Sequence, residues 1–295
     1  MSQVYFAKVN INKDIYKVYD KKLSIDTILS NLMDKDWQSC QYNYYIKEKD
    51  EVGNNKKETV KFISIDKFYD DRYLLGRLIK IYKDDIQLYD ETKDDIEDLP
   101  QKDLARSVAF YFDLKSETVA FVNKQKLSYK QFVELFEKLI NLIYGENMFV
   151  VILKKNAVEF RKRINLLDSI SKVEINLIPP NSSAEEFADL FPNSDEEIKA
   201  SNITRMAIQY SSPYTEKGLN IKSPLFERTI DATAKGWGDI SISGKMGDGN
   251  MEKIVSSIHA PYRKSIGRNY KDNFETLKNI AKAGISDLAN NKIRM

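Results

Sequence analysis

The 295-residue chain has one cysteine, Cys40, and one histidine, His259. A single cysteine cannot form an intramolecular disulfide, which indicates a reducing compartment, and we expect the protein in the cytoplasm. A single histidine excludes zinc sites built from several His and Cys side chains and phosphodiesterase sites built from paired histidines. A Ser-His-Asp triad could use only His259, and the sequence has no Gly-x-Ser-x-Gly turn to accompany it. We therefore expect no metal or organic cofactor.

Long apolar runs are also missing from the chain. No segment approaches the roughly 20 apolar residues that a membrane-spanning helix needs. Residues 1–6 lead directly into strand-like sequence, without the basic and apolar regions of a signal peptide. Hydrophobic residues make up 42% of the chain and charged residues 31%, with aromatic residues spread throughout. This composition predicts a folded protein without membrane insertion.

Glycine-rich phosphate loops are not recognisable either. The segment 244–249 contains three glycines and Lys245, but a Walker-type loop needs two glycines flanking four residues, then Lys and Ser or Thr at the start of a helix. Strand-like sequence flanks 244–249 instead, so we predict a hairpin turn. Lys245 stays a candidate for contact with a phosphate.

The apolar patterns predict an α+β protein with mixed, mostly antiparallel sheets and flanking helices, arranged in two parts. The dipeptide Pro179-Pro180 gives the predicted boundary between an N-terminal α+β domain, 1–178, and a C-terminal α+β domain, 179–295, that ends in a basic helix. We expect helices at 25–32, 128–145, 156–167, 224–234 and 274–289. We expect strands at 4–11, 42–46, 60–65, 73–82, 108–112, 118–122, 148–153, 173–178, 204–210, 239–243 and 251–258.

Charge is unevenly distributed although the net charge is only +2. Residues 84–103 are strongly acidic, and we expect them to form a solvated loop. The end of the chain is basic, and one segment of it interleaves aromatic and basic side chains. Arginine and lysine contact phosphates, and aromatic rings stack on exposed bases, so this segment is the best local sign of nucleic-acid binding. The candidate binding residues are Lys245, Tyr262, Arg263, Lys264, Arg268, Tyr270 and Lys271.

The order of predicted elements also resembles a group of bacterial proteins. It runs from the first strand through residues 73–78, the hairpin 110–123, the helix after Ser128, residues 173–181 and a late strand pair between 238 and 255. This order is similar to that of poorly characterised families associated with phage defence. It loosely resembles the RexA phage-exclusion proteins and the KwaB proteins of the Kiwa defence system. The resemblance implies a DNA-binding, non-nucleolytic protein of two α+β parts.

The leading hypothesis is a nucleic-acid-binding protein of antiphage defence or phage exclusion, without its own catalysis. We expect DNA rather than RNA as its ligand, a homodimer, and a second protein of the same defence system as a further candidate partner. One alternative is a metal-dependent nuclease using Asp113 and Lys115, because Asp-x-Lys is a fragment of such sites. Another is a protein–protein module, such as an inhibitor or a sensor of a phage component.

Overall fold

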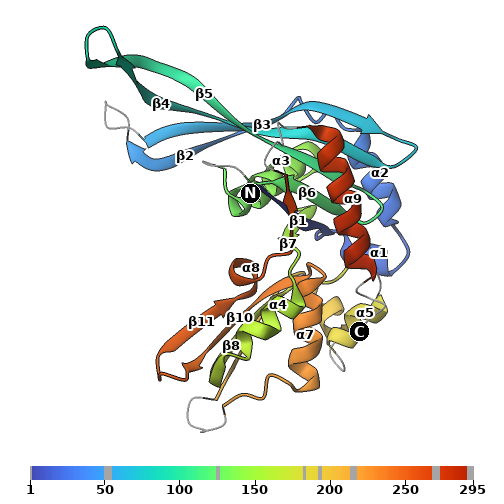
Figure 1. The fold of residues 1–295 in the computed structure, drawn as a ribbon. Helices are drawn as coiled ribbons and strands as arrows, with labels where there is room; N and C mark the ends of the chain where they lie inside the picture. The colour runs from blue at the N-terminus through green and yellow to red at the C-terminus, as the bar shows by residue number, and fades with distance from the viewer. Residues whose placement is uncertain are drawn as a thin grey trace.

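The computed structural model describes residues 2–49, 55–123, 127–181, 184–191, 195–212, 218–267 and 273–290, and of residues 48–49, 84–88 and 97–102 it describes the backbone alone. It confirms the predicted fold class. Antiparallel strands form two sheets, one of eight strands and one of four, and helices flank both (Figure 1).

The first sheet has the strand order β12-β1-β6-β5-β4-β3-β2, and β7 pairs with the remaining part of β1. Side chains alternate between its two faces, as they must along a strand. Phe110 and Phe112 face one core, while Ala109 and Tyr111 face another. The strands are β1 (Ser2–Ile11), β2 (Gln41–Lys49), β3 (Asn55–Phe68), β4 (Tyr73–Asp90), β5 (Asp95–Asp113), β6 (Thr118–Val122), β7 (Phe149–Leu153) and β12 (Arg263–Ile266).

Helices cover both faces of this sheet. α1 (Ile15–Tyr19), α2 (Ile25–Asp34) and α3 (Tyr129–Tyr144) share one core with it, and α9 (Phe274–Asn290) packs on the opposite face. The predicted helix starts are confirmed. The Ser24 hydroxyl accepts a hydrogen bond from the Thr27 amide at 3.0 Å, and Ser128 forms a reciprocal capping box with Gln131.

The second sheet has the order β11-β10-β8-β9 and is covered on one face. The predicted helix 156–167 is three residues too long: α4 ends at Ile164, and Leu167 already begins a strand. The strands are β8 (Leu167–Leu177), β9 (Met206–Ser211), β10 (Gly238–Met246) and β11 (Met251–Val255). The helices are α4 (Ala157–Ile164), α5 (Ala184–Leu190), α6 (Asp195–Ala200), α7 (Pro224–Ala234) and the short α8 (Ser256–His259).

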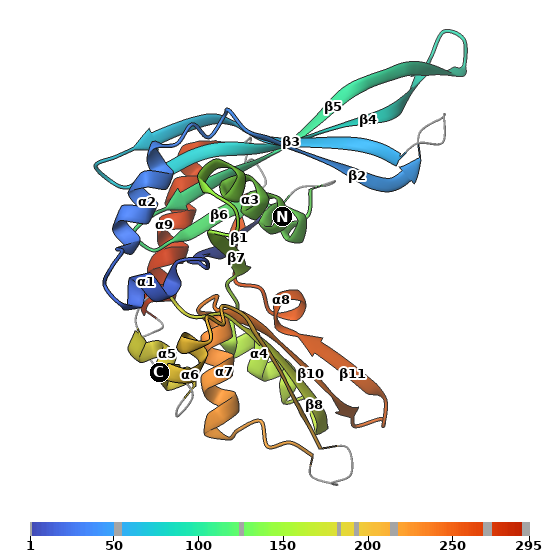
Figure 2. The same ribbon diagram turned by 180° about the vertical axis from the view of Figure 1, so that it is seen from behind.

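The two sheets divide the chain at places other than the predicted boundary. Residue 178 follows β8, which lies inside the second sheet, so a cut at 178/179 would split that sheet. The chain leaves the first sheet after Leu153 and returns to it with β12 and α9. Figure 2 shows α9 beside the first sheet, far from the other C-terminal elements. The double proline ends a strand, which sequence alone does not distinguish from a domain boundary.

The acidic segment 84–103 is not a loop, contrary to our prediction. β4 and β5 pair continuously from Tyr73↔Asp113 to Asp90↔Asp95, apart from one bulge. β3 pairs with β4 only as far as Ile81, so the end of this hairpin is a two-stranded ribbon that projects from the sheet by roughly 30 Å at 3.3 Å per residue. We predicted a loop because charged residues dominate this segment. Strands that are surrounded by solvent need no apolar face, so the alternating apolar pattern that identifies other strands is not required here. We call residues 82–103 the acidic arm.

Gly284 tests how α9 is held on the first sheet. A Cβ atom there would lie 2.2 Å from the Phe6 ring, in a buried contact. Gly284→Ala should therefore destabilise the protein by about 1–3 kcal/mol, as overpacking does. At an open helical position the same change would stabilise by up to about 1 kcal/mol, so its sign is decisive. Urea unfolding measures it, with the exposed Asn279→Ala in the same helix as control.

Candidate nucleic-acid interface

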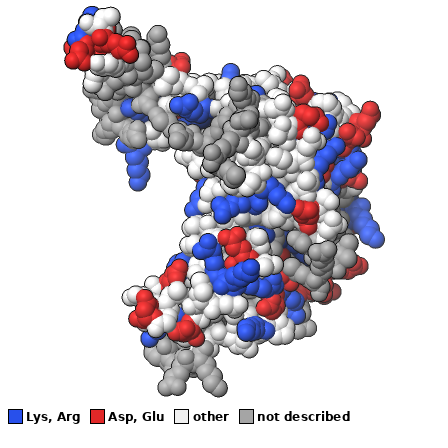
Figure 3. All heavy atoms as spheres, viewed as in Figure 1, with Lys and Arg blue, Asp and Glu red and all other residues white. Residues whose placement is uncertain are grey.

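A groove separates the first sheet from the second. Helices α4 and α7 lie on one side of the second sheet, and in the described part of the chain the short α8 is the one helix that bonds to a side chain of the other face, at the end where β10 begins (Figures 1 and 2). This open face forms one wall of the groove, and α3 with β7 forms the floor. Figure 3 shows the hollow surface between the acidic arm and the second sheet, with Lys and Arg atoms along its floor.

The open face of the second sheet is polar. Strand alternation and register place Glu174 and Asn176 of β8 beside Ser241 and Asp239 of β10. Glu174 accepts hydrogen bonds from Ser241 and from the lysines at 172 and 253, and these contacts lower the pKa of Glu174 to about 2. These two lysines are therefore paired. Among the described residues, the face has no aromatic ring on which a base could stack.

A cavity of about 390 Å³ lies where this face meets the floor of the groove. Its cationic lining comes from three distant segments: Lys130 in the first turn of α3, Lys155 between β7 and α4, and Arg205 just before β9. Arg205 also lines a neighbouring cavity of about 420 Å³ along α3, where its charge lies close to Glu137. Lys130 and Arg205 form no ion pair with a described carboxylate, and both are exposed.

Lys155 is the buried cation of this cavity, with only 3% of its surface exposed. Its amine donates to the carbonyl oxygen of Gly238, the first residue of β10. Burial lowers the pKa of Lys155 to about 8, and the nearby Asp239 opposes that shift. The backbone around Lys155 is fixed by a bridge to Pro261 and by the Asn156 amide, which donates to the Ala260 carbonyl at 2.8 Å.

Asp239 organises the anionic side of the cavity. Its carboxylate accepts hydrogen bonds from the hydroxyls of Ser256 and Ser257 and, at 3.1 Å, from the Ser257 amide. These residues begin α8, so Asp239 acts as a cap at the start of that short helix. His259 is occupied in the same turn, where its Nδ1 accepts from the Val255 amide at 2.8 Å. The two serine hydroxyls thus bond to Asp239 and not to the histidine.

The pleat of β12 divides the predicted basic segment between two faces. Arg263 pairs with Tyr5, whose ring stacks on Tyr129 at 4.7 Å, so Arg263 lies on the α3 side, close enough for its charge to act on Tyr129, the neighbour of Lys130 in the chain. Lys264 points the other way and forms an ion pair with Asp287 of α9, which raises the pKa of Lys264. Arg263 is thus the described cation of this segment that lies on the α3 side of the first sheet.

Tyr262 does not present a ring for base stacking, in contrast to our expectation. It is only 8% exposed, packs against Phe6 at 5.1 Å and donates to the Gly284 carbonyl at 3.3 Å. Lys245 is exposed but lies seven residues along β10 from Gly238, about 23 Å at 3.3 Å per residue. It is therefore remote from the cavity. Arg268, Tyr270 and Lys271 lie outside the described residues.

Asp113, the centre of the nuclease alternative, has a role in a turn. Its carboxylate accepts hydrogen bonds from the Ser116 hydroxyl at 2.6 Å and the Ser116 amide at 3.3 Å, which closes the connection between β5 and β6. In the parts of the chain that the structure describes, no group of three or more His, Cys, Asp or Glu side chains is arranged to hold a metal ion.

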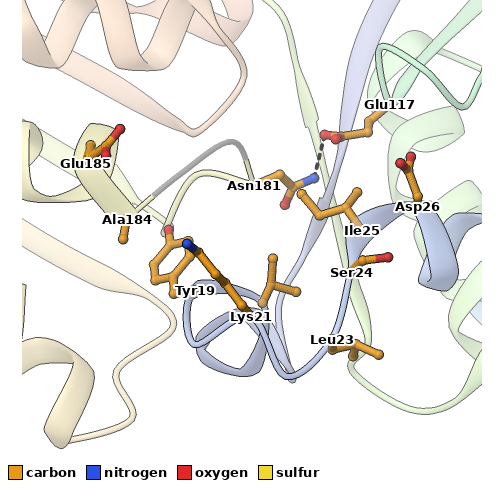
Figure 4. A pocket seen from close by; sticks show the side chains of 11 residues that line it. Tyr19, Lys21, Leu23, Ser24, Ile25, Asp26, Glu117, Asn181, Ala184 and Glu185 are labelled. Carbon is orange, nitrogen blue, oxygen red and sulfur yellow. Dashed lines mark hydrogen bonds between the residues drawn. The ribbon is translucent and has the colours of Figure 1, made fainter.

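A second cavity, of about 630 Å³, lies between α1, α2 and the start of α5 (Figure 4). Its innermost polar groups bond to the protein. The side-chain amide of Asn181 donates to Glu117 at 2.6 Å and to the Val9 carbonyl at 3.0 Å, and its oxygen accepts from the Ile11 amide at 2.7 Å. Glu117 also pairs with Lys8 at 2.5 Å. We interpret this cluster as structural.

Asn181→Ala tests that interpretation. Three hydrogen bonds of a fully buried side chain would be lost. Each buried donor or acceptor that is left without a partner destabilises a protein by about 1–3 kcal/mol. The free energy of unfolding should fall by roughly 2–4 kcal/mol, because the partial relaxation of neighbours recovers some of the loss. Chemical denaturation gives the value, and the exposed Asn165→Ala serves as comparison. A loss below that of the comparison variant would contradict a structural role.

Because the pKa of the buried Lys155 is lowered, we expect the stability of the protein to depend on pH. Its pKa in the folded protein, about 8, lies below the ordinary value of 10.5, so the unfolded chain binds more protons between these values. Stability should therefore rise with pH from about 8 to 10 relative to Lys155→Met, by a few kcal/mol at most, since one unit of pKa difference is about 1.4 kcal/mol. Denaturation of both proteins at pH 7, 8, 9 and 10 measures the difference, and parallel curves would refute it.

Sequence reasoning missed Lys130, Lys155 and Arg205. Arg205 stands alone in the sequence, Lys155 directly follows Lys154, and Lys130 lies four residues after Lys126, so nothing connects the three locally and only the fold brings them together. The one available sign was the pair Lys154-Lys155 directly after the apolar run 148–153, where a buried strand ends and positive charge follows. The helix prediction at Ser128 also placed Lys130 in a first turn, but not its partners.

Together, the fold and the groove define an α+β protein with an antiparallel sheet whose polar face is open beside a cationic cavity. The chain belongs to the DUF4747 family, described as a domain of unknown function, whose model matches residues 21–283. No curated protein matches the chain. Among the described residues, none of the helices has the length and apolar character to cross a membrane.

Proposed function

We propose that this protein binds nucleic acid in the groove, through the phosphate backbone and without catalysis of its own. The observation that carries the proposal is the convergence of Lys130 and Arg205 on the cavity from distant segments, with Arg263 on the same α3 side of the first sheet. Each is exposed, and none forms an ion pair with a described carboxylate. Cations left unpaired on a concave surface are the footprint that phosphate contacts require.

The distribution of charge supports the same proposal. Nine acidic and three basic residues between 82 and 103 give the acidic arm a charge of −6, so the rest of the chain carries +8 within the net charge of +2. The arm projects by roughly 30 Å beyond Ile81, the last residue of β4 that also pairs with β3. The Debye length is about 8 Å at physiological salt, so the arm's end does not neutralise the field at the groove.

The open face shapes the mode of binding. Because its described side chains include no aromatic ring, we infer contacts with phosphate and sugar and not base stacking. Such contacts suit a duplex, and we favour DNA. We place the protein in the cytoplasm, in antiphage defence or phage exclusion, on the strength of its lone cysteine and the order of its elements.

Self-association also belongs to this proposal. Tyr89 and Ile96 face each other across the acidic arm and are 61% and 59% exposed. A two-stranded ribbon is marginally stable alone in water, and a homodimer would cover such apolar side chains. Sedimentation of the wild type and of Tyr89→Ser with Ile96→Ser would show whether the arm contributes.

Neutralising the groove tests DNA binding. In the triple variant Lys130→Gln, Arg205→Gln and Arg263→Gln, three phosphate contacts are lost. The slope of log K against log salt should shrink by about 2.7, at about 0.9 per contact on duplex DNA. Fluorescence anisotropy between 50 and 200 mM salt gives the slope.

The matched control removes three exposed cations from the covered side of the second sheet, with Lys162→Gln, Lys222→Gln and Arg228→Gln. Total charge changes equally in both triple variants, so only the position differs. Equal slopes in the two variants would place the binding site elsewhere. Absence of DNA and RNA binding by the wild type at low salt would refute the proposal. Cleavage of either by the wild type with magnesium or manganese would favour the nuclease alternative.

A further inference from the structure

We propose that the cavity around Lys155 binds a phosphate monoester, carried either by the end of a nucleic-acid strand or by a free nucleoside monophosphate. The strand-end source rests on the proposed function, whereas the free nucleotide does not. The phosphate would lie against the Lys155 amine, with Lys130 and Arg205 at the rim of the cavity.

The first argument is the incomplete coordination of a buried amine. A lysine ammonium has three donor hydrogens. Lys155 is 97% buried, yet its amine has one hydrogen-bond acceptor among the described residues, the Gly238 carbonyl. Buried charges in proteins are paired or bind a ligand, because desolvation without compensation is costly. Lys155 and Gly238, whose carbonyl accepts from the amine, both line the cavity, so an anion inside it would supply the acceptors that the protein does not.

The second argument is the sign of the charges around the cavity. Three cations, Lys130, Lys155 and Arg205, line it against one carboxylate, Asp239. That carboxylate is directed to the two serine hydroxyls and the start of α8, so it is already satisfied without Lys155. The excess positive charge therefore faces the cavity, where a phosphate dianion would balance it.

The third argument is size and lining. A volume of about 390 Å³ lies in the range of small-ligand sites, roughly 300–1,000 Å³, and accommodates one nucleotide but no second. Val133, Leu153 and Leu177 supply an apolar wall beside the cations. Asn176 and Ser257 add polar groups at the opening. A phosphate next to a flat, partly apolar group matches this combination, and inorganic phosphate alone would leave the apolar wall uncovered.

The experiment compares one oligonucleotide with a 5′-phosphate and the same oligonucleotide with a 5′-hydroxyl. The wild type should bind the phosphorylated form about tenfold or more tightly, because contacts of a phosphate with buried and rim cations are charge-assisted. Calorimetric titration with a nucleoside monophosphate, and with the matching nucleoside as control, tests the free ligand. The comparison of oligonucleotides tests a phosphate at the end of a strand, and the titration tests the free nucleoside monophosphate.

Two variants locate the effect. Lys155→Met keeps an unbranched side chain as far as Cε and removes the amine with its charge, so it should abolish the preference for phosphate while the 5′-hydroxyl oligonucleotide still binds. Asn176→Trp changes an exposed position and fills the opening of the cavity without touching the amine. It should have the same effect, and it keeps the test valid if Lys155→Met does not fold. Lys245→Met, at the far end of β10, is the control and should change nothing.

The outcomes separate this inference from the proposed function. Equal affinity for both oligonucleotides, together with no nucleoside monophosphate binding, overturns the inference and leaves groove binding standing. Nucleoside monophosphate binding that Asn176→Trp abolishes, without any oligonucleotide binding, supports the inference and overturns the proposed function. A phosphate preference that survives in both variants places the phosphate elsewhere and also overturns the inference.

Discussion

The architecture depends on the way strand β1 shares one edge between two partners. Residues Ser2 to Tyr5 pair with β12, and residues Ala7 to Ile11 pair with β7 on the same edge. Between them, the Phe6 carbonyl accepts from the Lys154 amide at 2.8 Å, and the Lys154 carbonyl accepts from the Tyr262 amide at 2.8 Å. This break in the ladder is where the chain crosses to the second sheet and where it returns. The cavity lies beside this crossing because Lys155 directly follows it.

The other edge of β1 is completed by a side chain. β6 pairs with β1 from Val4 to Lys8, and beyond it the amide of Asn181 bonds to the Val9 carbonyl and the Ile11 amide, as a neighbouring strand would. Asn10 adds a bond to the Gly236 carbonyl at 3.0 Å, in the segment that leads into β10. The second sheet is thus fastened to β1 through two buried asparagines. The Asn181 side chain has partners for both its oxygen and its nitrogen, whereas the buried side-chain oxygen of Asn10 has no partner among the described residues.

Sequence patterns predicted local structure well and failed where distant segments meet. Capping residues such as Ser128 and a one-sided apolar pattern were enough for α3, because helix starts depend on near neighbours. The acidic arm was missed because its run of charged residues is typical of a loop, whereas beyond Ile81 the backbones of β4 and β5 pair with each other alone. The basic segment was read as one cluster, but the pleat places Arg263 on the α3 side of the sheet and Lys264 on the opposite side, where it pairs with Asp287. The register between paired strands decides on which side of the sheet a side chain lies, and the local composition of a segment does not reveal that register.

The energetic balance at Lys155 connects folding with binding. A buried ammonium lowers the stability of the empty protein, as its pKa of about 8 indicates, and Met at this position would avoid that cost. The backbone carbonyl of Gly238 compensates for one donor only. The same desolvation strengthens any charge contact made in the cavity, because the effective dielectric constant is lower there than at the surface. A residue that weakens the fold is thereby placed where it would strengthen binding to an anion. Lys130 and Arg205, exposed at the rim, carry no such cost and would mainly guide the ligand inward.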